Sequence, residues 1–421
     1  MATRKHLIIG AGSAALAAAR EIRSVSQDDE IVLITREDVP PYYVAVLPYL
    51  ISGRMQESDL WLLDDDQVRE LQLSHMRGKE VTSVNPDKKR ITYAGGEQES
   101  YDTLLIASGS HPLKPDIKGL DEVGFLPFHT LADLRRLQGQ LNGKKDIAIY
   151  GGGLVAIELA VALREAGYRV TVIVRSRILR RYFDPEAATI IKDILVSNGV
   201  QIHEGCTIEA LKENKATVEV ALSNATTLTT EAIAVCLGVK PSLSFLSDTG
   251  IACSDGVLVD RGMRTNRADV YAAGDAAEAP DFFTGTPGLS PILPSAIGQG
   301  KVAGRNMAGE EATYEGWIPM NILHFFGQRA VSVGIMENGD TRVLQATDKK
   351  GRGFKKLVFQ GDSLVGASFL GVDVFPGVFH YLISNNVNIG PHAELLFEKP
   401  KETSCWLMLK TEKEEAMSLE E

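Results

Sequence analysis

The sequence predicts an α/β fold in which two similar strand–turn–helix repeats are followed by a smaller α+β region. Each repeat begins with a short apolar strand that runs into a glycine-rich turn, Gly10-Ala11-Gly12 in the first and Gly151-Gly152-Gly153 in the second. In both places a helix follows the turn and a second apolar strand follows the helix, which is the order of a parallel β–α–β unit. The sequence therefore indicates a tandem internal repeat.

The elements of the first repeat follow in a regular order. We expect a strand at residues 7–9, a helix from Ala14 to Val25 and a strand at residues 31–34. Two alternating strands then flank the turn at residues 85–88, and an apolar strand ends at Ala107-Ser108-Gly109. Alternation is typical of half-buried strands, and continuous apolar runs are typical of a buried parallel sheet.

The second repeat has the same succession of elements. Strands are expected at residues 147–149 and 170–174, with a helix between them. Alternating residues at 216–228 and a closing strand at 232–237 follow, before Gly238.

The first repeat is completed only after the second has ended. Residues 270–273 form a predicted strand that ends in Gly274-Asp275, and Pro294-Ser295-Ala296 opens a helix that runs to about Met307. Beyond residue 316 the pattern changes to a hairpin within residues 356–371. We predict three domains, formed by residues 1–112 with 242–315, by residues 113–241, and by residues 316–421.

The composition excludes several classes of protein. The 421 residues carry 44 Lys and Arg against 55 Asp and Glu, a net charge of −11, with no basic tract, so we expect no nucleic-acid partner. The runs without charged residues are interrupted by glycine and proline, so we expect no membrane span. Residues 4–6 and the apolar stretch after them resemble a secretory signal, but they also form the first strand and turn, and we expect a cytoplasmic protein.

The cysteines and histidines point away from metal and disulfide chemistry. The four cysteines show no CxxC spacing, which excludes a dithiol pair, an iron–sulfur cluster within the chain and a structural zinc. The eight histidines include no pair at the spacing of metal ligands, so we predict no metal.

The two glycine-rich turns indicate two dinucleotide sites. Glycine lets the backbone N–H groups approach a pyrophosphate, and the helix that follows points its positive end at the negative charge. Different surroundings suggest that one turn holds a flavin dinucleotide and the other a nicotinamide dinucleotide.

With these motifs in this order, the chain resembles the FAD-dependent pyridine nucleotide-disulfide oxidoreductases, the broad family of glutathione reductase, NADH oxidase, rubredoxin reductase and the flavin part of nitrite reductase. The resemblance covers residues 1–310 and, more loosely, the remainder. It implies two Rossmann-like dinucleotide-binding domains, with the NAD(P) domain inserted in the FAD domain, and a C-terminal α+β interface domain that serves dimerisation.

The resemblance also implies which residues hold FAD. Glu37 falls where a carboxylate accepts hydrogen bonds from the adenosine ribose, with an ordinary solvated glutamate as the alternative. Asp275 matches the family aspartate on the ribityl chain, with an ordinary turn as the alternative. The helix after Pro294 would point its N-terminus at the flavin N1/O2 edge. The remaining FAD residues are Gly10, Gly12, Ser13, Ala14, Ala15, Ala45, Pro48, Ala107, Ser108, Gly109, Gly274, Ser295 and Ala296.

A second set of residues is implied for the nicotinamide cofactor. Glu158 matches a glutamate that contacts the nicotinamide end in relatives, with a helix-surface carboxylate as the alternative. Arg175 and Arg177 follow the strand 170–174 where an NAD enzyme usually has an acid, so they favour the 2′-phosphate of NADP, although arginine also stacks on the adenine of NAD. The other members of the set are Gly151, Gly153, Leu154, Val155 and Gly238.

The segment 40–49 departs from the thiol-using branches of this family. Those branches carry a redox cysteine where this chain has Ala45. We therefore expect no peroxidase, water-forming oxidase or disulfide-reductase mechanism and no catalytic side chain, because the flavin accepts hydride and releases single electrons by itself.

The electrons then need a partner, and a separate iron–sulfur or ferredoxin-like protein is the expected one. Residues 42–53 also resemble the FAD subunit of 2-oxoacid:acceptor oxidoreductase complexes such as phenylglyoxylate dehydrogenase, which implies NAD as the nicotinamide cofactor and a place in a larger complex. The chain would then be a homodimer or part of a hetero-oligomer. The alternatives are a free-standing NAD(P)H oxidase, quinone reductase or rubredoxin reductase, and a nucleotide-sensing flavoprotein.

Overall fold

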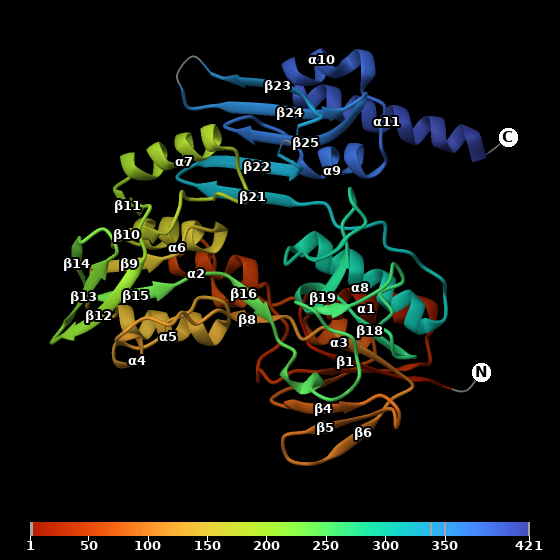
Figure 1. Cartoon of the computed structure of the whole chain (residues 1–421). Helices are drawn as coiled ribbons and strands as arrows, with labels where there is room; N and C mark the ends of the chain where they lie inside the picture. Colours follow the sequence, from red (N-terminus) through yellow and green to blue (C-terminus); the bar gives the residue numbers. More distant parts are fainter. Residues whose placement is uncertain (1–2, 337–338, 349–350, 420–421) are drawn as a thin grey trace. The chain divides into compact units, whose positions relative to one another are not determined.

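The computed structural model describes residues 3–336, 339–348 and 351–419, and it confirms the predicted α/β class (Figure 1). The chain forms two compact units, each of which brings together segments that are distant in the sequence. Unit 1 comprises Met1–Val46, Met55–His111 and Val239–Trp317; unit 2 comprises Leu47–Arg54, Pro112–Gly238 and Ile318–Glu421.

Unit 1 is built on a parallel sheet of five strands in the order β18-β7-β1-β2-β3. The strand β18, which comes from the segment after the second repeat, pairs with β7 and so completes a sheet begun near the N-terminus. The prediction that residues 270–273 return to the first repeat is thereby confirmed. The strands are β1 (Lys5–Ile9), β2 (Glu30–Ile34), β3 (Leu73–Met76), β7 (Thr103–Ile106) and β18 (Val270–Ala272).

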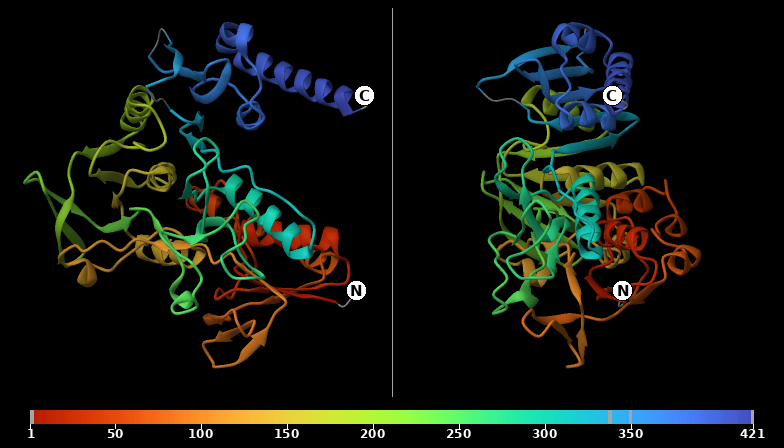
Figure 2. Two further views of the ribbon diagram at one scale, coloured as in Figure 1. Left: turned by 45° about the vertical axis from the view of Figure 1, so that its right-hand side comes forward. Right: turned by 90° about the vertical axis from the view of Figure 1, so that its right-hand side faces the viewer.

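Two helices of unit 1, α1 (Ser13–Val25) and α8 (Leu293–Ala308), lie side by side (Figures 1 and 2). Gly300 and Gly304 of α8 allow this close packing. A Cβ atom on Gly300 would lie 3.0 Å from the carbonyl carbon of Ala14, and one on Gly304 would lie 2.8 Å from the Cα of Ala18. Glycine spaced by four residues therefore brings the two helix backbones into direct contact.

Short elements surround the sheet of unit 1. The strands β4 (Val81–Asn85) and β5 (Arg90–Tyr93) are the alternating pair that the sequence predicts around residues 85–88. The other elements are η1 (Val44–Val46), η2 (Glu57–Asp59), α3 (Asp65–Glu70), β6 (Gln98–Ser100), β8 (Ser110–Pro112), β16 (Val239–Pro241), η3 (Ser244–Leu246), β17 (Val257–Leu258), η4 (Gly274–Ala276), β19 (Ala277–Pro280) and β20 (Pro287–Leu289).

Unit 2 contains the second parallel sheet, of four strands in the order β11-β10-β9-β15. Its strands are β9 (Asp146–Tyr150), β10 (Arg169–Val174), β11 (Val200–Glu204) and β15 (Ala232–Val235). The helices and antiparallel strands of this part are α2 (Leu47–Ile51), α4 (Leu120–Val123), α5 (Leu131–Leu141), α6 (Leu154–Glu165), α7 (Pro185–Ser197), β12 (Ile208–Asn214), β13 (Thr217–Leu222) and β14 (Thr227–Thr230).

The C-terminal part of unit 2 is an antiparallel sheet of five strands in the order β21-β22-β25-β24-β23. The predicted hairpin within residues 356–371 is its β24–β25 pair. Phe354, Phe359 and Phe369 are almost fully buried in its core. The elements are β21 (Met320–Phe325), β22 (Gln328–Gly334), β23 (Arg342–Thr347), β24 (Phe354–Gln360), β25 (Ser363–Leu370), α9 (Pro376–Ser384), η5 (Gly390–His392), α10 (Ala393–Glu398) and α11 (Pro400–Leu419).

Within residues 3–336, 339–348 and 351–419, no helix combines the length and the apolar character needed to cross a bilayer. Over the same ranges, no three His, Cys, Asp or Glu side chains are grouped as metal ligands would be. The division into three domains with the expected boundaries stays a prediction.

Candidate functional site

The first glycine turn is fixed between two strand ends of unit 1. Gly10 has φ +125°, a conformation that favours glycine, and its N–H donates a 2.8 Å hydrogen bond to the carbonyl of Ile34. A Cβ atom on Gly10 would lie 2.7 Å from the carbonyl carbon of Ala107. The structure therefore places Gly10 against Ala107, as a turn between the ends of β1, β2 and β7.

Gly12 differs from Gly10 because it faces open space. No heavy atom lies within 4 Å of the position that its Cβ would take. Gly12 is also the N-cap residue of α1, where it offers no side-chain acceptor to the helix N–H groups, and the first turn contains no acidic residue. The N–H groups at Ser13, Ala14 and Ala15 are thus available to an external anion.

The start of α8 approaches the same turn. A Cβ atom on Gly274 would lie 3.1 Å from the Cβ of Ala14 and 3.8 Å from that of Ala296, so three segments distant in sequence meet here. The N-terminus of α8 has no side-chain cap either. Ser295 in its first turn is buried, and its hydroxyl lies 2.9 Å from the hydroxyl of Ser290.

Asp275 is held by a residue that sequence reasoning did not identify. The hydroxyl of Ser110 donates a 2.6 Å hydrogen bond to Oδ2 of Asp275, which is half-buried. The residues just before Ser110 are bonded to the segment that follows β16: Ser108 Oγ donates to the Ser242 carbonyl at 2.9 Å, and the Gly109 carbonyl accepts from Ser242 N at 3.0 Å. Asp275 therefore lies on a hydrogen-bonded edge beyond the ends of β7 and β18.

Glu37 is half-buried in the loop after β2 rather than fully solvated. The phenol of Tyr42 donates a 2.8 Å hydrogen bond to its Oε2, and the Glu37 N–H donates to Oγ1 of Thr35 at 3.2 Å. These contacts hold the carboxylate in place and leave oxygen lone pairs for further donors.

Ala45 lies in η1, within an exposed apolar segment. Tyr43 and Val44, which precede it, are 40% and 43% exposed, and Ala45 itself is exposed. This segment therefore exposes apolar surface next to Ala45. Pro48, by contrast, is buried in α2, which belongs to unit 2.

The second glycine turn reproduces the geometry of the first within unit 2. Gly151 has φ +144°, and its N–H donates a 2.9 Å hydrogen bond to the carbonyl of Ile173 in β10. A Cβ atom on Gly151 would lie 2.8 Å from the carbonyl carbon of Cys236, which follows β15. Gly151 therefore occupies the same position in the parallel sheet of unit 2 as Gly10 does in the parallel sheet of unit 1.

The helix that follows this turn also begins without a cap. Gly153 is the N-cap residue of α6 and supplies no side-chain acceptor. Leu154 is half-buried and Val155 is 46% exposed, so the start of the helix is open on one side. The ring of Tyr182, a residue that sequence reasoning missed, lies 3.7 Å from the position of a Cβ on Gly153.

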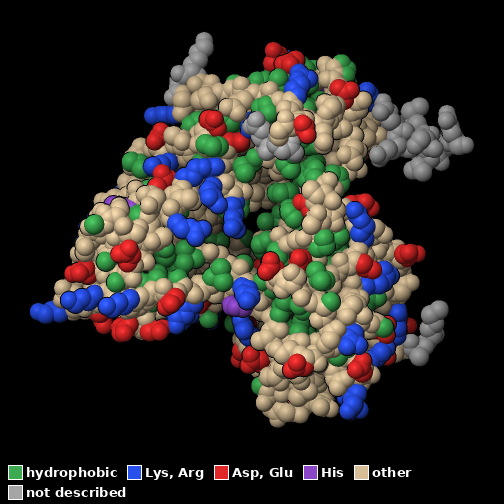
Figure 3. Space-filling view, in the orientation of Figure 1, with side chains coloured by type: hydrophobic (Ala, Val, Ile, Leu, Met, Phe, Trp, Pro, Cys, Tyr) green, Lys and Arg blue, Asp and Glu red, His purple; other side chains and the backbone are tan. Residues whose placement is uncertain are grey.

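The structure separates the two arginines that follow β10. Arg177 is half-buried, and its guanidinium donates to backbone carbonyls of its own loop, to Phe183 at 2.8 Å and Ile178 at 3.2 Å. Arg175 is exposed at the strand end. Lys and Arg side chains gather beside α7 in the space-filling view (Figure 3). Arg175 is therefore the better placed of the two to meet a phosphate.

Glu158 lies one turn into α6, in a confined space of about 10 Å³. Burial raises the pKa of its carboxyl to about 7. The arginine in this space, Arg54, forms an ion pair with Glu165. The other residues that line it are Tyr49, Ser52, Val161, Ala162 and His324. Glu158 is thus a half-buried carboxyl group that is partly removed from water.

Gly238 is exposed after β15 and has φ +104°; its carbonyl accepts a 3.0 Å hydrogen bond from Leu113 N. It lies at the carboxyl edge of the parallel sheet of unit 2, the edge at which such sheets bind ligands.

The two turns fit dinucleotides on physical grounds. Two helices elsewhere in the described chain, α5 and α3, receive a side-chain cap, from Thr130 and from Asp64 respectively. The starts of α1 and α6 have glycine instead, so their N–H groups remain free for a pyrophosphate. Glu37 and Asp275 supply carboxylates in the unit that contains the first turn, and a carboxylate can accept hydrogen bonds from the hydroxyl groups of a sugar.

Two parts of the chain match known families. Residues 4–300 match the family described as pyridine nucleotide-disulphide oxidoreductase. Residues 319–373 match the rubredoxin NAD⁺ reductase C-terminal domain.

Two known proteins are similar over most of the chain. The NADH-dependent phenylglyoxylate dehydrogenase subunit epsilon of Aromatoleum evansii is 35% identical over 395 residues, which cover 92% of this chain and 93% of the relative. The NADH-rubredoxin oxidoreductase of Clostridium acetobutylicum is 31% identical over 351 residues, which cover 83% of this chain and 86% of the relative.

Solved structures share the fold. The NADH:rubredoxin oxidoreductase from Clostridium acetobutylicum superposes with a TM-score of 0.71 at 28% identity, covering 88% of this chain and 92% of that one. A chain of the covalent putidaredoxin reductase–putidaredoxin complex gives a TM-score of 0.86 and covers 95% of this chain and 97% of that one. At 20% identity, the second likeness concerns the fold alone.

Proposed function

Because the chain belongs to the pyridine nucleotide-disulphide oxidoreductase family, we propose that it exchanges a hydride between a nicotinamide dinucleotide and FAD, and electrons between FAD and a separate iron–sulfur protein. As a member of this family it is a flavoprotein oxidoreductase that uses FAD and NAD(P)(H). We further propose that it is the flavin subunit of a larger complex of the 2-oxoacid:NAD oxidoreductase type.

The observation that carries the proposal is the repeated geometry of Gly10 and Gly151. The N–H of each glycine donates a hydrogen bond to a carbonyl of one neighbouring strand. Each glycine also lies against a carbonyl that follows a second neighbouring strand, and each precedes a helix without a side-chain cap. Two equivalent anion sites in one chain fit two pyrophosphates. We assign FAD to residues 10–15, because Asp275 and the start of α8 belong to that unit, and the nicotinamide dinucleotide to residues 151–155.

The side chain at Ala45 supports an external electron acceptor. An alanine in the exposed η1 segment provides no sulfur to accept electrons next to the flavin. The four cysteines are free thiols separated in the sequence, and the thiol pKa values of Cys206, Cys236 and Cys253 are raised by burial, which disfavours the reactive thiolate. FAD supplies both two-electron and one-electron chemistry when bound, so the protein's part is to hold and shield it.

The relatives supply the kind of partner. One is named as a rubredoxin oxidoreductase and another as a subunit of phenylglyoxylate dehydrogenase. Both names support electron exchange with another protein, and the second supports a place in a complex. The exposed Tyr43 and Val44 offer apolar surface beside Ala45.

The test is anaerobic mixing of the purified, FAD-loaded protein with NADH and, separately, NADPH. Loss of flavin absorbance with at least one of them is expected, followed by its return when an oxidised ferredoxin or rubredoxin is added. No bleaching with either nucleotide would contradict the proposal. Rapid consumption of oxygen by the isolated chain would favour the free-standing oxidase instead.

Membership of a complex is tested by native purification. Co-eluting chains that contain iron are expected, identified by mass spectrometry and iron analysis. Recovery of the protein as a lone homodimer would contradict the complex while leaving the hydride transfer intact.

A further inference from the structure

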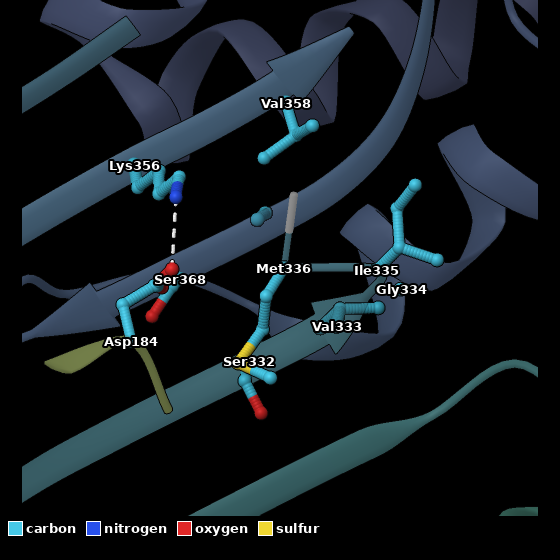
Figure 4. Close-up of a pocket in the computed structure, with 10 residues that line it drawn as sticks. Asp184, Ser332, Val333, Gly334, Ile335, Met336, Lys356, Val358 and Ser368 are labelled. Atoms are coloured by element: carbon cyan, nitrogen blue, oxygen red, sulfur yellow. Dashed lines mark hydrogen bonds and ion pairs between the residues drawn. The ribbon is translucent and has the colours of Figure 1, made fainter. Parts of the chain in front are cut away.

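Unit 2 contains a buried ion pair between Asp184 and Lys356. The Lys356 Nζ donates a 2.8 Å hydrogen bond to Asp184 Oδ1, and the two side chains are only 6% and 3% exposed (Figure 4). Asp184 directly precedes α7, whereas Lys356 lies in β24 of the antiparallel sheet. The pair therefore joins the loop after β10 to a different part of the same unit.

Stability alone does not account for this pair. Removing two charges from water carries a large free-energy cost, and apolar replacements of a buried pair are often neutral or stabilising. Asp184 does not cap α7 with its side chain, and its Oδ2 and the Ser368 hydroxyl have no hydrogen-bond partner within the described chain. A cavity of about 10 Å³ beside them has the room that one bridging water needs.

The loop that ends at Asp184 contacts the second glycine turn. The Leu179 N–H donates a 2.6 Å hydrogen bond to the carbonyl of Gly152, and the Tyr182 ring lies beside Gly153. Leu179 has φ +53°, a conformation that is unfavourable for leucine and persists only where the surroundings impose it. Arg177 further ties the loop through the carbonyl of Phe183, next to Asp184.

We propose that the Asp184–Lys356 pair is a clamp that fixes the loop of residues 175–183 against Gly152, and thereby sets the affinity for the nicotinamide dinucleotide. Lys356 is then a positioning residue that acts through Asp184 from outside the cofactor site. The proposal rests on the proposed function, since it takes residues 151–155 as the site of the nicotinamide dinucleotide.

The test uses the full-length, FAD-loaded protein and ADP-ribose, which contains the adenosine and pyrophosphate but lacks the nicotinamide ring. Asp184→Asn and Lys356→Met are expected to raise the ADP-ribose Kd, measured by calorimetry, and the KM for NADH or NADPH about tenfold, which is the effect of weakening about one hydrogen bond to the bound dinucleotide. We expect kcat and FAD content to change little. Arg342→Met is the matched control, because Arg342 lies in the same sheet and pairs with Glu394 at the surface.

The double variant Asp184→Leu/Lys356→Met separates positioning from stability. It is expected to regain the thermal stability that the single variants lose, because no unpaired charge remains buried, yet to keep the weak ADP-ribose binding. Recovery of binding together with stability would overturn the clamp, as would single variants that bind ADP-ribose normally. A parent protein that retains FAD but does not bind ADP-ribose would overturn the assignment of the nicotinamide site, and the clamp with it.

Discussion

The hydroxyl of Ser110 donates a 2.6 Å hydrogen bond to Oδ2 of Asp275, across 165 positions of sequence. The contact orients a carboxylate that we assign to the ribityl chain of FAD. We expect Ser110→Ala to raise the Kd for FAD about tenfold or more, since a hydrogen bond to a charged group contributes about 1.5–3 kcal/mol. Fluorescence titration of the apoprotein with FAD measures this. Ser24→Ala, on the exposed side of α1, is the control and is expected to bind FAD normally.

Gly10 and Gly12 differ in the role of the missing side chain, and alanine variants separate the two roles. Gly10→Ala places a Cβ atom 2.7 Å from the Ala107 carbonyl carbon at φ +125°, so we expect it to destabilise the apoprotein by several kcal/mol. Gly12→Ala meets open space in the chain, and we expect near-normal stability of the apoprotein but weaker FAD binding. Urea unfolding and FAD titration test both. Equal losses of stability would show that Gly12 has a structural role.

We expect Arg175 to decide the choice between NADP and NAD, because the guanidinium of Arg177 donates to carbonyls of its own loop. We expect Arg175→Glu to lower the ratio of kcat/KM for NADPH to kcat/KM for NADH at least tenfold. A carboxylate repels the 2′-phosphate of NADPH, whereas it accepts a hydrogen bond from the 2′-hydroxyl of NADH. Arg180→Glu makes the same change of charge in the same loop and is expected to alter the ratio far less. If the parent enzyme has no activity with NADPH, and if Arg175→Glu leaves the rate with NADH unchanged, Arg175 is not part of the nicotinamide dinucleotide site.

The raised pKa of the Glu158 carboxyl predicts that NAD⁺ binding depends on pH. Burial raises the pKa of this carboxyl to about 7, so it changes from neutral to ionised near neutral pH. Because the oxidised nicotinamide ring is cationic, the Kd for NAD⁺ is expected to fall as the pH rises from 6 to 8. Calorimetry on the parent and on Glu158→Gln tests this, and the variant is expected to show a flat profile. The same slope in the variant would assign the titration to another group, such as His324, which lines the same space.

The same carboxyl predicts the pH dependence of stability. The folded protein holds the Glu158 proton up to about pH 7, whereas the unfolded chain loses it near its ordinary pKa of 4.5. The folded state therefore binds more protons between these values, and the free energy of unfolding falls as the pH rises through this window, by on the order of 3 kcal/mol. Urea unfolding at pH 5 and pH 8 is expected to show a smaller difference in Glu158→Gln than in the parent.

The parallel sheets and glycine turns could be predicted from the sequence because their signals are local. An apolar strand that runs into Gly10 or Gly151 is recognisable within ten residues, and the structure places β1 and β9 where the sequence predicts strands. The strand before Gly274-Asp275 was recognised in the same way. The sequence also predicts that this strand joins the first sheet, because the first repeat is still incomplete when the second begins.

The contacts that complete the sites could not be predicted, because they join residues whose spacing in the sequence carries no signal. Ser110 meets Asp275, Tyr42 meets Glu37, and Tyr182 reaches Gly153 only through the tertiary fold. The burial of Glu158 was equally hidden, since a glutamate after the first turn of a helix is more often solvated. The roles assigned to these residues remain predictions for the experiments above.

The C-terminal sheet shows a different reason why some strands could not be predicted from the sequence. The sequence predicted its central hairpin from strong alternation around residues 361–362, but not β21, β22 or β23. The strand β23 has only half-buried and exposed residues, so its sequence carries no apolar face. Such an edge strand is defined by pairing with β24 rather than by its own pattern.

The packing of Gly300 and Gly304 against α1 has a consequence for the order in which the protein folds during synthesis. The ribosome releases α1, β1 and β2 long before it makes β18 and α8, which complete their sheet and cover their helix. The face of α1 that packs against α8 therefore stays uncovered while the intervening residues 112–238 are synthesised. Nascent chains that end before about residue 308 should remain sensitive to protease in residues 1–111, because such non-local contacts form only when their last segment arrives.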